Sequence, residues 1–275
     1  MNGIVEIEVI RLLAAYLLAL GVLFLARKTG ALSEILVALL RMSIQLVLVG
    51  FLLEHLLERP NLALTLLVFL VMEAFAVHNI FRRVPLPTPP GLKRVIIASM
   101  VIGTVGSVGF FLVVIVGVEP WYTPRYFIPL GGMLIGNSMT GISLGFERLS
   151  VGIRDNSTKI EGALMLGASV HDAAHDYAVL AFRAAIMPTV NAMMGMGVVF
   201  LPGMMTGQIL SGSSPVTAIR YQIAIMLGIF AAVALTVYLM TEFGYRCYFN
   251  HAAQLQVPAK ESRPSKAPKL HARRE

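Results

Sequence analysis

The sequence has 275 residues, of which 57% are hydrophobic and only 13% are Asp, Glu, Lys or Arg. Because soluble domains carry charge on about a quarter of their residues, this composition excludes an ordinary water-soluble protein. The net charge is +7, but six Lys or Arg and two Glu follow Asn250, so the basic charge indicates a solvated tail rather than a nucleic-acid-binding face.

Seven stretches are apolar for long enough to cross a bilayer as helices, which takes about 20 residues. Lys and Arg gather in alternate connections, and the positive-inside rule assigns these connections to the cytoplasm. We therefore predict an all-α integral membrane protein, a polytopic helical bundle with an external N-terminus and a cytoplasmic C-terminus. The predicted spans are about 4–25, 32–57, 62–81, 95–118, 127–146, 187–210 and 215–240.

The predicted membrane domain covers residues 1–249 and contains a long cytoplasmic connection at about 148–186. Residues 250–275 are polar, basic and contain proline, which predicts a disordered cytoplasmic tail.

Two groups of glycines and one proline indicate where helices approach closely or break. Small residues at a spacing of four share one helix face, so we expect tight helix packing there, with a backbone-lined substrate path as the alternative. A broken helix inside a membrane lines a cavity where its freed backbone groups find partners. These packing and break residues are Gly132, Gly136, Gly141, Gly145, Pro202 and Gly203.

Ionisable residues within membrane spans are costly and are candidates for function. Arg41 and Glu73 fall at matching depth in neighbouring predicted spans, so we expect them to pair, either for neutralisation or for a gating or cargo role. Methionine is a soft metal ligand but also a common filler of apolar gaps. The other candidates for the translocation path are Gln45, Asn137, Asn191, Met193, Met204 and Met205.

Histidines at positions 171 and 175 share a helix face, with Asp172 and Asp176 beside them. This spacing could hold a metal ion or build a membrane enzyme. A polar face turned toward solvent or a partner protein explains the same pattern, so the metal remains unknown.

The segment from Glu161 to Ser169 predicts a short helix outside the membrane, with a glycine break, before a proline at the next span. It resembles the EAA-type coupling loop of ABC transporter permeases, in which an acidic residue, small residues and a glycine precede such a proline. That resemblance implies contacts with an ATPase subunit. The residues it assigns to ATPase coupling are Glu161, Ala163, Gly167, Ala168, Arg183 and Pro188.

Longer segments resemble the FetB-type iron-export ABC transporter permeases, a family with plant relatives linked to aluminium tolerance. The matching segments are Ile128–Met139, Phe200–Gly207 and Pro215–Ile223, with Arg41, Gln45, Leu46 and Gly50. The resemblance implies a non-enzymatic permease of the cell inner membrane that exports a metal ion, with iron as the attributed cargo. It also implies a homodimer and separate ATPase subunits.

The sequence contains no Gly-x-x-x-x-Gly-Lys-Ser/Thr phosphate-binding loop. ATP and magnesium are therefore expected on the partner chain, and no cofactor is expected on this one. The alternative is a gradient-driven secondary transporter or channel that has no ATPase partner.

Overall fold

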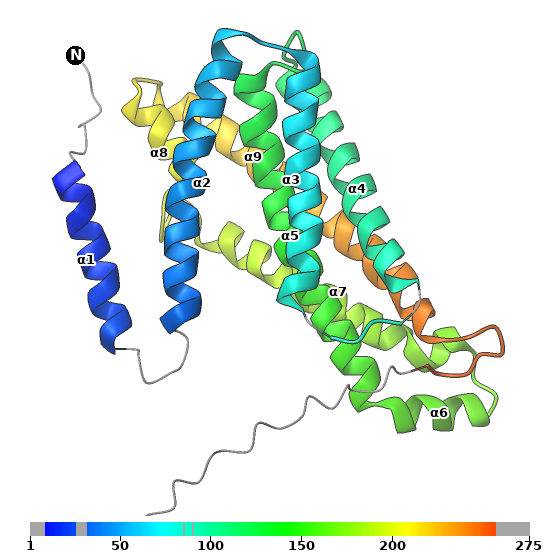
Figure 1. Cartoon of the computed structure of the whole chain (residues 1–275). Helices are drawn as coiled ribbons and strands as arrows, with labels where there is room; N and C mark the ends of the chain where they lie inside the picture. The colour runs from blue at the N-terminus through cyan, green and yellow to red at the C-terminus, as the bar shows by residue number, and fades with distance from the viewer. Residues whose placement is uncertain (1–8, 26–31, 85, 90, 257–275) are drawn as a thin grey trace, which may run out of the picture. The chain divides into compact units, whose positions relative to one another are not determined.

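The computed structural model describes residues 9–25, 32–84, 86–89 and 91–256, and these are almost entirely helical (Figure 1). Within them, β-pairing is limited to two isolated bridges. The predicted all-α membrane fold is confirmed. The elements are α1 (Val9–Leu25), α2 (Leu32–Glu58), α3 (Leu62–Arg83), α4 (Leu92–Phe110), η2 (Phe111–Val116), α5 (Pro124–Asp155), α6 (Ser157–Met165), α7 (Val170–Gly195), α8 (Gly203–Leu210), α9 (Pro215–Gly244) and η3 (Tyr245–Tyr248).

Six helical stretches of the described chain are long and apolar enough to cross a membrane. They are Ile35–Glu58, Leu62–Arg83, Leu92–Val116, Pro124–Asp155, Val170–Gly195 and Pro215–Tyr248. In α1 the apolar part, Ile10–Gly21, is shorter than a full span. The count of seven spans and the orientation of the termini therefore stay predictions.

The predicted span at 187–210 is interrupted in the structure, and Pro202 and Gly203, where the sequence indicated a break, stand at the start of α8. The preceding helix, α7, begins at Val170, contains Pro188 in its interior and ends at Gly195. A bridge joins Met196 to Phe200, and Gly197 has a positive φ of 83°, which a helix does not allow. The interruption therefore begins before Pro202, in a glycine-rich turn that follows Gly195.

The first half of α7 was not predicted as part of a membrane span, because its buried face is made of small residues rather than large apolar ones. Buried positions recur every three or four residues, which is the period of one helix face. They are Ala174, Ala178, Ala181, Ala185 and Thr189.

The described chain divides into two compact units, each built from several separate segments. Unit 1 comprises residues 1–71, 109–132 and 192–228, and unit 2 comprises residues 72–108, 133–191 and 229–275. Aromatic side chains from two of its segments pack together in unit 1. In it, Phe69 meets Phe127 edge to face with ring centroids 5.3 Å apart, and the Trp121 ring lies 6.0 Å from Phe127.

In unit 2, α5 packs against two helices through glycines. A Cβ atom on Gly141 would lie 2.9 Å from Val233 Cγ1 of α9, and one on Gly145 would lie 3.4 Å from Ala185 Cβ of α7. On α4, Gly103 is pressed against Thr236 of α9 in the same way. Close backbone approach of this kind is the usual basis of helix association in membranes.

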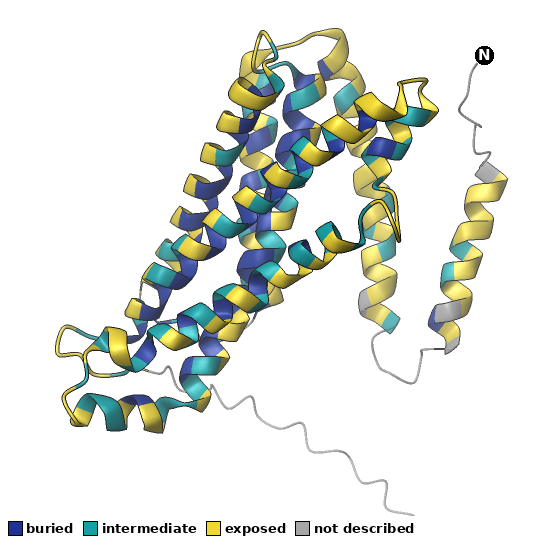
Figure 2. Ribbon diagram, turned by 180° about the vertical axis from the view of Figure 1, so that it is seen from behind, coloured by how far each residue is buried: buried dark blue, intermediate teal, exposed yellow. Residues whose placement is uncertain are grey.

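Exposed apolar side chains cover α1 and α2, which Figure 2 shows largely in the colour of exposed residues. None of the most apolar window of α2 is buried. Because a helix that is apolar all round is not stable in water, this surface is suited to lipid tails or to another protein chain.

The contact at Gly141 gives a first prediction. Substituting Gly141→Ala places a methyl group against the stiff, branched Val233 and should cost about 1–3 kcal/mol of stability, as overpacking does. Thermal unfolding of the detergent-solubilised protein measures the loss.

Gly136→Ala is the matched control, because a Cβ at Gly136 would meet nothing within 4 Å. The control should be neutral or slightly stabilised, since alanine favours helix more than glycine does. Equal melting temperatures for the two variants would contradict this packing.

Candidate functional site

The end of α6 is closed by a glycine cap. The amide of Ala168 donates to the Ala163 carbonyl at 3.0 Å, and the amide of Gly167 donates to the Leu164 carbonyl at 3.0 Å. With Gly167 at a φ of 91°, this is the pair of bonds that defines a Schellman motif. The chain therefore leaves α6 in a fixed direction.

Two apolar side chains project beside this cap. Met165 is 84% exposed and Leu166 is 91% exposed. Together with Leu164, Gly167 and Ala168 they form what we call the α6 knob. These side chains leave apolar surface in contact with solvent on a rigid turn. Burial of that surface by a partner is favourable.

A cleft of about 580 Å³ lies beside the α6 knob, within unit 2. One wall is formed by Glu161, Leu164, Met165 and Ala168, and the other by residues 252–255. In Figure 1 this second wall is the red turn near α6. The cleft therefore combines two segments about 90 residues apart in the sequence.

Residues 249–256 form the turn that supplies the second wall. The Asn250 side-chain oxygen accepts bonds from the amides of Ala252 and Gln254, each at 2.9 Å, and Phe249 pairs with Leu255. Residues 250–256, which the sequence assigned to the disordered tail, thus have a hydrogen-bonded structure. The rest of that tail, 257–275, lies outside the described residues.

A capping box starts α7 directly after the α6 knob. Ser169 Oγ accepts a bond from the Asp172 amide at 3.1 Å and donates to Asp172 Oδ2 at 2.7 Å. An acidic residue here also interacts favourably with the positive end of the helix dipole. The knob is therefore fixed at both sides, by the glycine cap of α6 and by the serine cap of α7.

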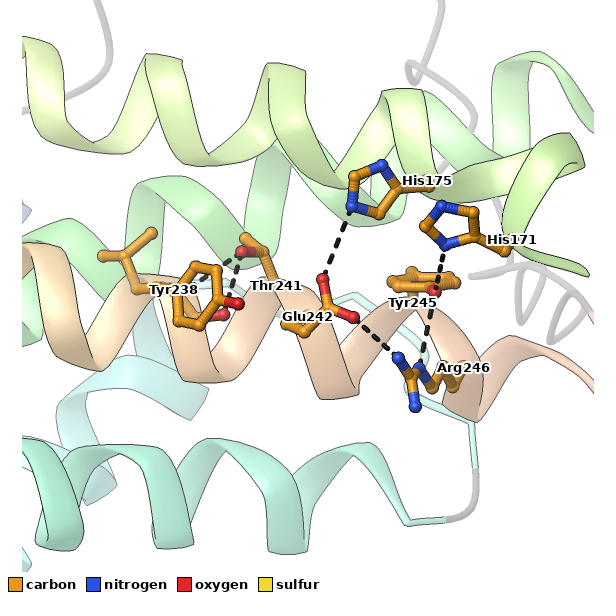
Figure 3. Close-up of polar contacts among 8 residues, drawn as sticks. His171, His175, Tyr238, Thr241, Glu242, Tyr245 and Arg246 are labelled. Carbon is orange, nitrogen blue, oxygen red and sulfur yellow. Dashed lines mark hydrogen bonds and ion pairs between the residues drawn. The ribbon is translucent and has the colours of Figure 1, made fainter.

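The first turns of α7 join the end of α9 through a polar network (Figure 3). His175 Nε2 lies 3.5 Å from Glu242 Oε2, and Arg246 pairs with Glu242 Oε1 at 2.7 Å. His171 Nδ1 lies 3.2 Å from the Tyr245 hydroxyl oxygen, and the two imidazole centroids are 4.3 Å apart. We call these five residues the α7–α9 junction.

Arg246 also contacts Tyr245 in this junction. Its Nε donates a hydrogen bond to the Tyr245 hydroxyl oxygen at 3.3 Å. The Tyr245 hydroxyl group therefore lies between Arg246 and His171 Nδ1 and joins the two side chains in one network.

A second bond ties the end of α5 to the same region. Ser150 and Tyr248 share a buried hydrogen bond of 2.7 Å between their hydroxyl oxygens. The Tyr177 ring of α7 also lies 3.5 Å from where a Cβ on Gly152 would be. The end of α5, the η3 turn that follows α9 and the start of α7 thus meet in unit 2.

The structure places the predicted coupling residues unevenly. Glu161 and Ala168 line the cleft, Ala163 and Gly167 make the cap of α6, and Arg183 is exposed farther along α7. The sequence placed Pro188 at the start of a span, but it lies well inside α7. It is therefore not the point where the chain re-enters a helix.

The predicted translocation residues divide between the two units. Unit 1 holds Arg41, Gln45, Met193, Met204 and Met205, and unit 2 holds Glu73, Asn137 and Asn191. Glu73 and Met205 are buried, whereas Gln45, Asn137 and Asn191 are exposed. A common path and the Arg41–Glu73 pair therefore stay predictions.

The described residues contain no group of three or more His, Cys, Asp or Glu side chains arranged to hold a metal ion. In the predicted His/Asp cluster, Asp172 turns to Ser169 and both histidines turn to α9. Sequence reasoning missed Glu242, Tyr245 and Arg246. The available signal was a carboxylate four residues before an arginine at the end of the last span, a spacing that pairs charges on a helix.

Comparison with known proteins matches most of this chain. The model of the "Uncharacterised protein family (UPF0014)" matches residues 9–249. A UPF0014 membrane protein of Synechocystis is 40% identical over 217 residues, which cover 79% of this chain and 83% of the relative. No solved structure matches.

Two further relatives carry names that suggest a role. Protein ALUMINUM SENSITIVE 3 of Arabidopsis thaliana is 32% identical over 82% of this chain and 81% of its own length. The probable iron export permease protein FetB of Escherichia coli is 31% identical over 89% of this chain and 93% of its own length.

The glycine cap gives a second prediction. Gly167→Ala puts a Cβ in the left-handed region and should cost about 1–2 kcal/mol. Hydrogen exchange at the Ala168 amide, which donates the bond that closes the cap, should become faster.

Gly162→Ala is the control for this change. It makes the same substitution inside α6, where no atom lies within 4 Å of the new Cβ. This variant should exchange more slowly or as the wild type does, because alanine is the better helix former. The cap is refuted if both variants leave the Ala168 amide equally protected.

Proposed function

Because the chain belongs to the UPF0014 family of membrane proteins, we propose that it is the membrane-spanning permease subunit of an ABC transporter, with iron as its cargo. The name of the Escherichia coli relative supports the iron cargo and the direction of export. In this proposal the chain transports the cargo and catalyses no reaction itself.

The α6 knob is the observation that carries the proposal. Its two exposed apolar side chains, Met165 and Leu166, stand on a turn that is capped on both sides. Burying such a side chain is worth about 1.5–3 kcal/mol. In the proposed complex, the ATPase subunit covers these side chains and the cleft beside Glu161.

The α7–α9 junction supports a route for coupling. The knob is continuous with the start of α7, and the junction ties that start to Glu242 of α9 and to Tyr245 of η3, which directly follows α9. A push on the knob would therefore act on two long helices together. Such coupling through a packed, hydrogen-bonded chain of residues needs no flexible linker.

The proposed assembly takes ATP and magnesium on the partner ATPase. The amino-acid sequence of this chain offers no phosphate-binding loop for them. We place two copies of this chain in the complex and the complex in the cell inner membrane. The exposed apolar surface of α1 and α2 supports contact with lipid or with the second copy.

The alternative function is a gradient-driven transporter without an ATPase. Glu73 favours it, because it is a buried carboxylate inside a membrane-competent helix, and such groups serve as ion relays in secondary transporters. The two functions are distinguished by whether this chain retains an ATPase subunit when it is purified.

Co-purification gives the third prediction. The tagged wild-type protein, extracted in mild detergent from its native cells, should retain an ATPase that mass spectrometry identifies by its phosphate-binding loop. Leu166→Asp places a charge on the knob, so the retained amount should fall about tenfold or more, as a loss of about 1.4 kcal/mol or more predicts.

Val199→Asp is the matched control. Val199 is 81% exposed and lies in the turn after the far end of α7, so the same change should leave the ATPase bound. If the wild type retains no ATPase, the gradient-driven function replaces the proposed one. If both variants lose the ATPase to the same extent, the α6 knob is not part of the interface.

A further inference from the structure

Glu73 is a carboxylic acid near the middle of a membrane-competent helix. It lies eleven residues after Leu62 and ten before Arg83 in α3, which is about 15 Å from either end. Its exposed fraction is only 5%. Neither water nor a headgroup region is therefore within easy reach of its side chain.

Neither carboxyl oxygen of Glu73 has a hydrogen-bond partner with standard geometry. The polar group beside it is the hydroxyl of Thr104, which is itself fully buried on α4 in the same unit. No charged side chain acts on Glu73 from the described part of unit 2. Within the described part of unit 2, the polar side chain that acts on Glu73 is thus the Thr104 hydroxyl group.

The direction of the Thr104 hydroxyl decides which form of Glu73 fits. Thr104 Oγ1 donates its hydrogen to the Met100 carbonyl at 2.7 Å within α4. A hydroxyl has one hydrogen, so Thr104 offers Glu73 only lone pairs. An ionised carboxylate would face these lone pairs with no donor, whereas a protonated carboxyl group can donate its own hydrogen to Thr104.

Burial energetics favour the same form. An ionised side chain without a partner in the interior costs several kcal/mol, and in membranes such groups are neutralised by pairing or protonation. Binding a proton removes the charge and supplies the missing donor in one step. A cation that reaches the carboxylate would neutralise it in the same way.

We propose that Glu73 is a proton-binding site inside the membrane, protonated at rest and hydrogen-bonded to Thr104, at which the transported cation displaces the proton. The O–H bond breaks, the carboxylate oxygens bind the cation, and the proton passes to the water that hydrates the arriving cation. The exchange with cargo rests on the proposed transport function, but the protonated resting state does not.

A hydrophobic carbodiimide tests the resting state, because it reacts with protonated carboxyl groups. The acid proton moves to a carbodiimide nitrogen while the carboxyl oxygen adds to the central carbon. Full-length protein in lipid vesicles is treated with dicyclohexylcarbodiimide at neutral pH, and the modified peptides are quantified by mass spectrometry. Glu147 and Glu161, which are exposed in the same unit, are internal controls.

Glu73 should be modified about tenfold faster than either control, because solvent-exposed carboxyl groups are ionised at neutral pH. Glu73→Gln should remove this label and leave the protein folded, since glutamine keeps the shape of the side chain. If the reagent modifies Glu73 no faster than Glu147, the proposal that Glu73 is protonated at rest is overturned.

Infrared spectroscopy provides a reading that does not depend on reagent access. The carbonyl band of a protonated carboxylic acid should be present in the wild type and absent in Glu73→Gln. Thr104→Val removes the acceptor and should move this band to higher frequency, whereas Thr104→Ser should leave it in place. Absence of the band in the wild type would also overturn the proposal.

The exchange is tested by adding ferrous ion under anaerobic conditions before the carbodiimide. Bound cation should slow the labelling of Glu73 about tenfold and leave that of Glu147 unchanged. Labelling at an unchanged rate would overturn the exchange. A failure of the proposed ATPase partnership would instead appear in co-purification, with the labelling of Glu73 intact.

Discussion

The close approach of α5 to α9 and α7 is the contact on which the rest of unit 2 depends. Glycine at 141 and 145 removes the side chains that would hold the helices apart, and Ala185 completes the contact on α7. In a membrane the lipid tails are as apolar as leucine, so burying apolar surface gives little drive to helix association. Close packing between the helix backbones must therefore drive the association of these helices.

That contact determines what meets at the ends of the helices. It leaves the end of α9 beside the start of α7, where Glu242 and Tyr245 engage His175 and His171. The α6 knob sits directly before this start and carries exposed apolar side chains at its tip. One packed scaffold thus connects the α6 knob to two long helices, which is the arrangement that the proposed coupling requires.

The helical class, most helix positions and the short helix before Gly167 could be predicted from the sequence, because long apolar runs and a glycine break are local signals. The start of α7 could not, since its buried face consists of alanines and the segment has no run of large apolar side chains. The α7–α9 junction joins residues about 70 positions apart, and no local pattern pairs His171 with Tyr245. The protonated form proposed for Glu73 likewise depends on Thr104 of another helix.

Site-specific photocrosslinking in native cells tests the central proposal most directly. A photoreactive amino acid at position 166, which is 91% exposed in the α6 knob, would be compared with the same photoreactive amino acid at position 199 in the turn after α7. The account predicts an adduct between position 166 and an ATPase subunit, and none from position 199. An ATPase adduct missing from position 166, in cells where the protein is inserted and stable, would contradict it.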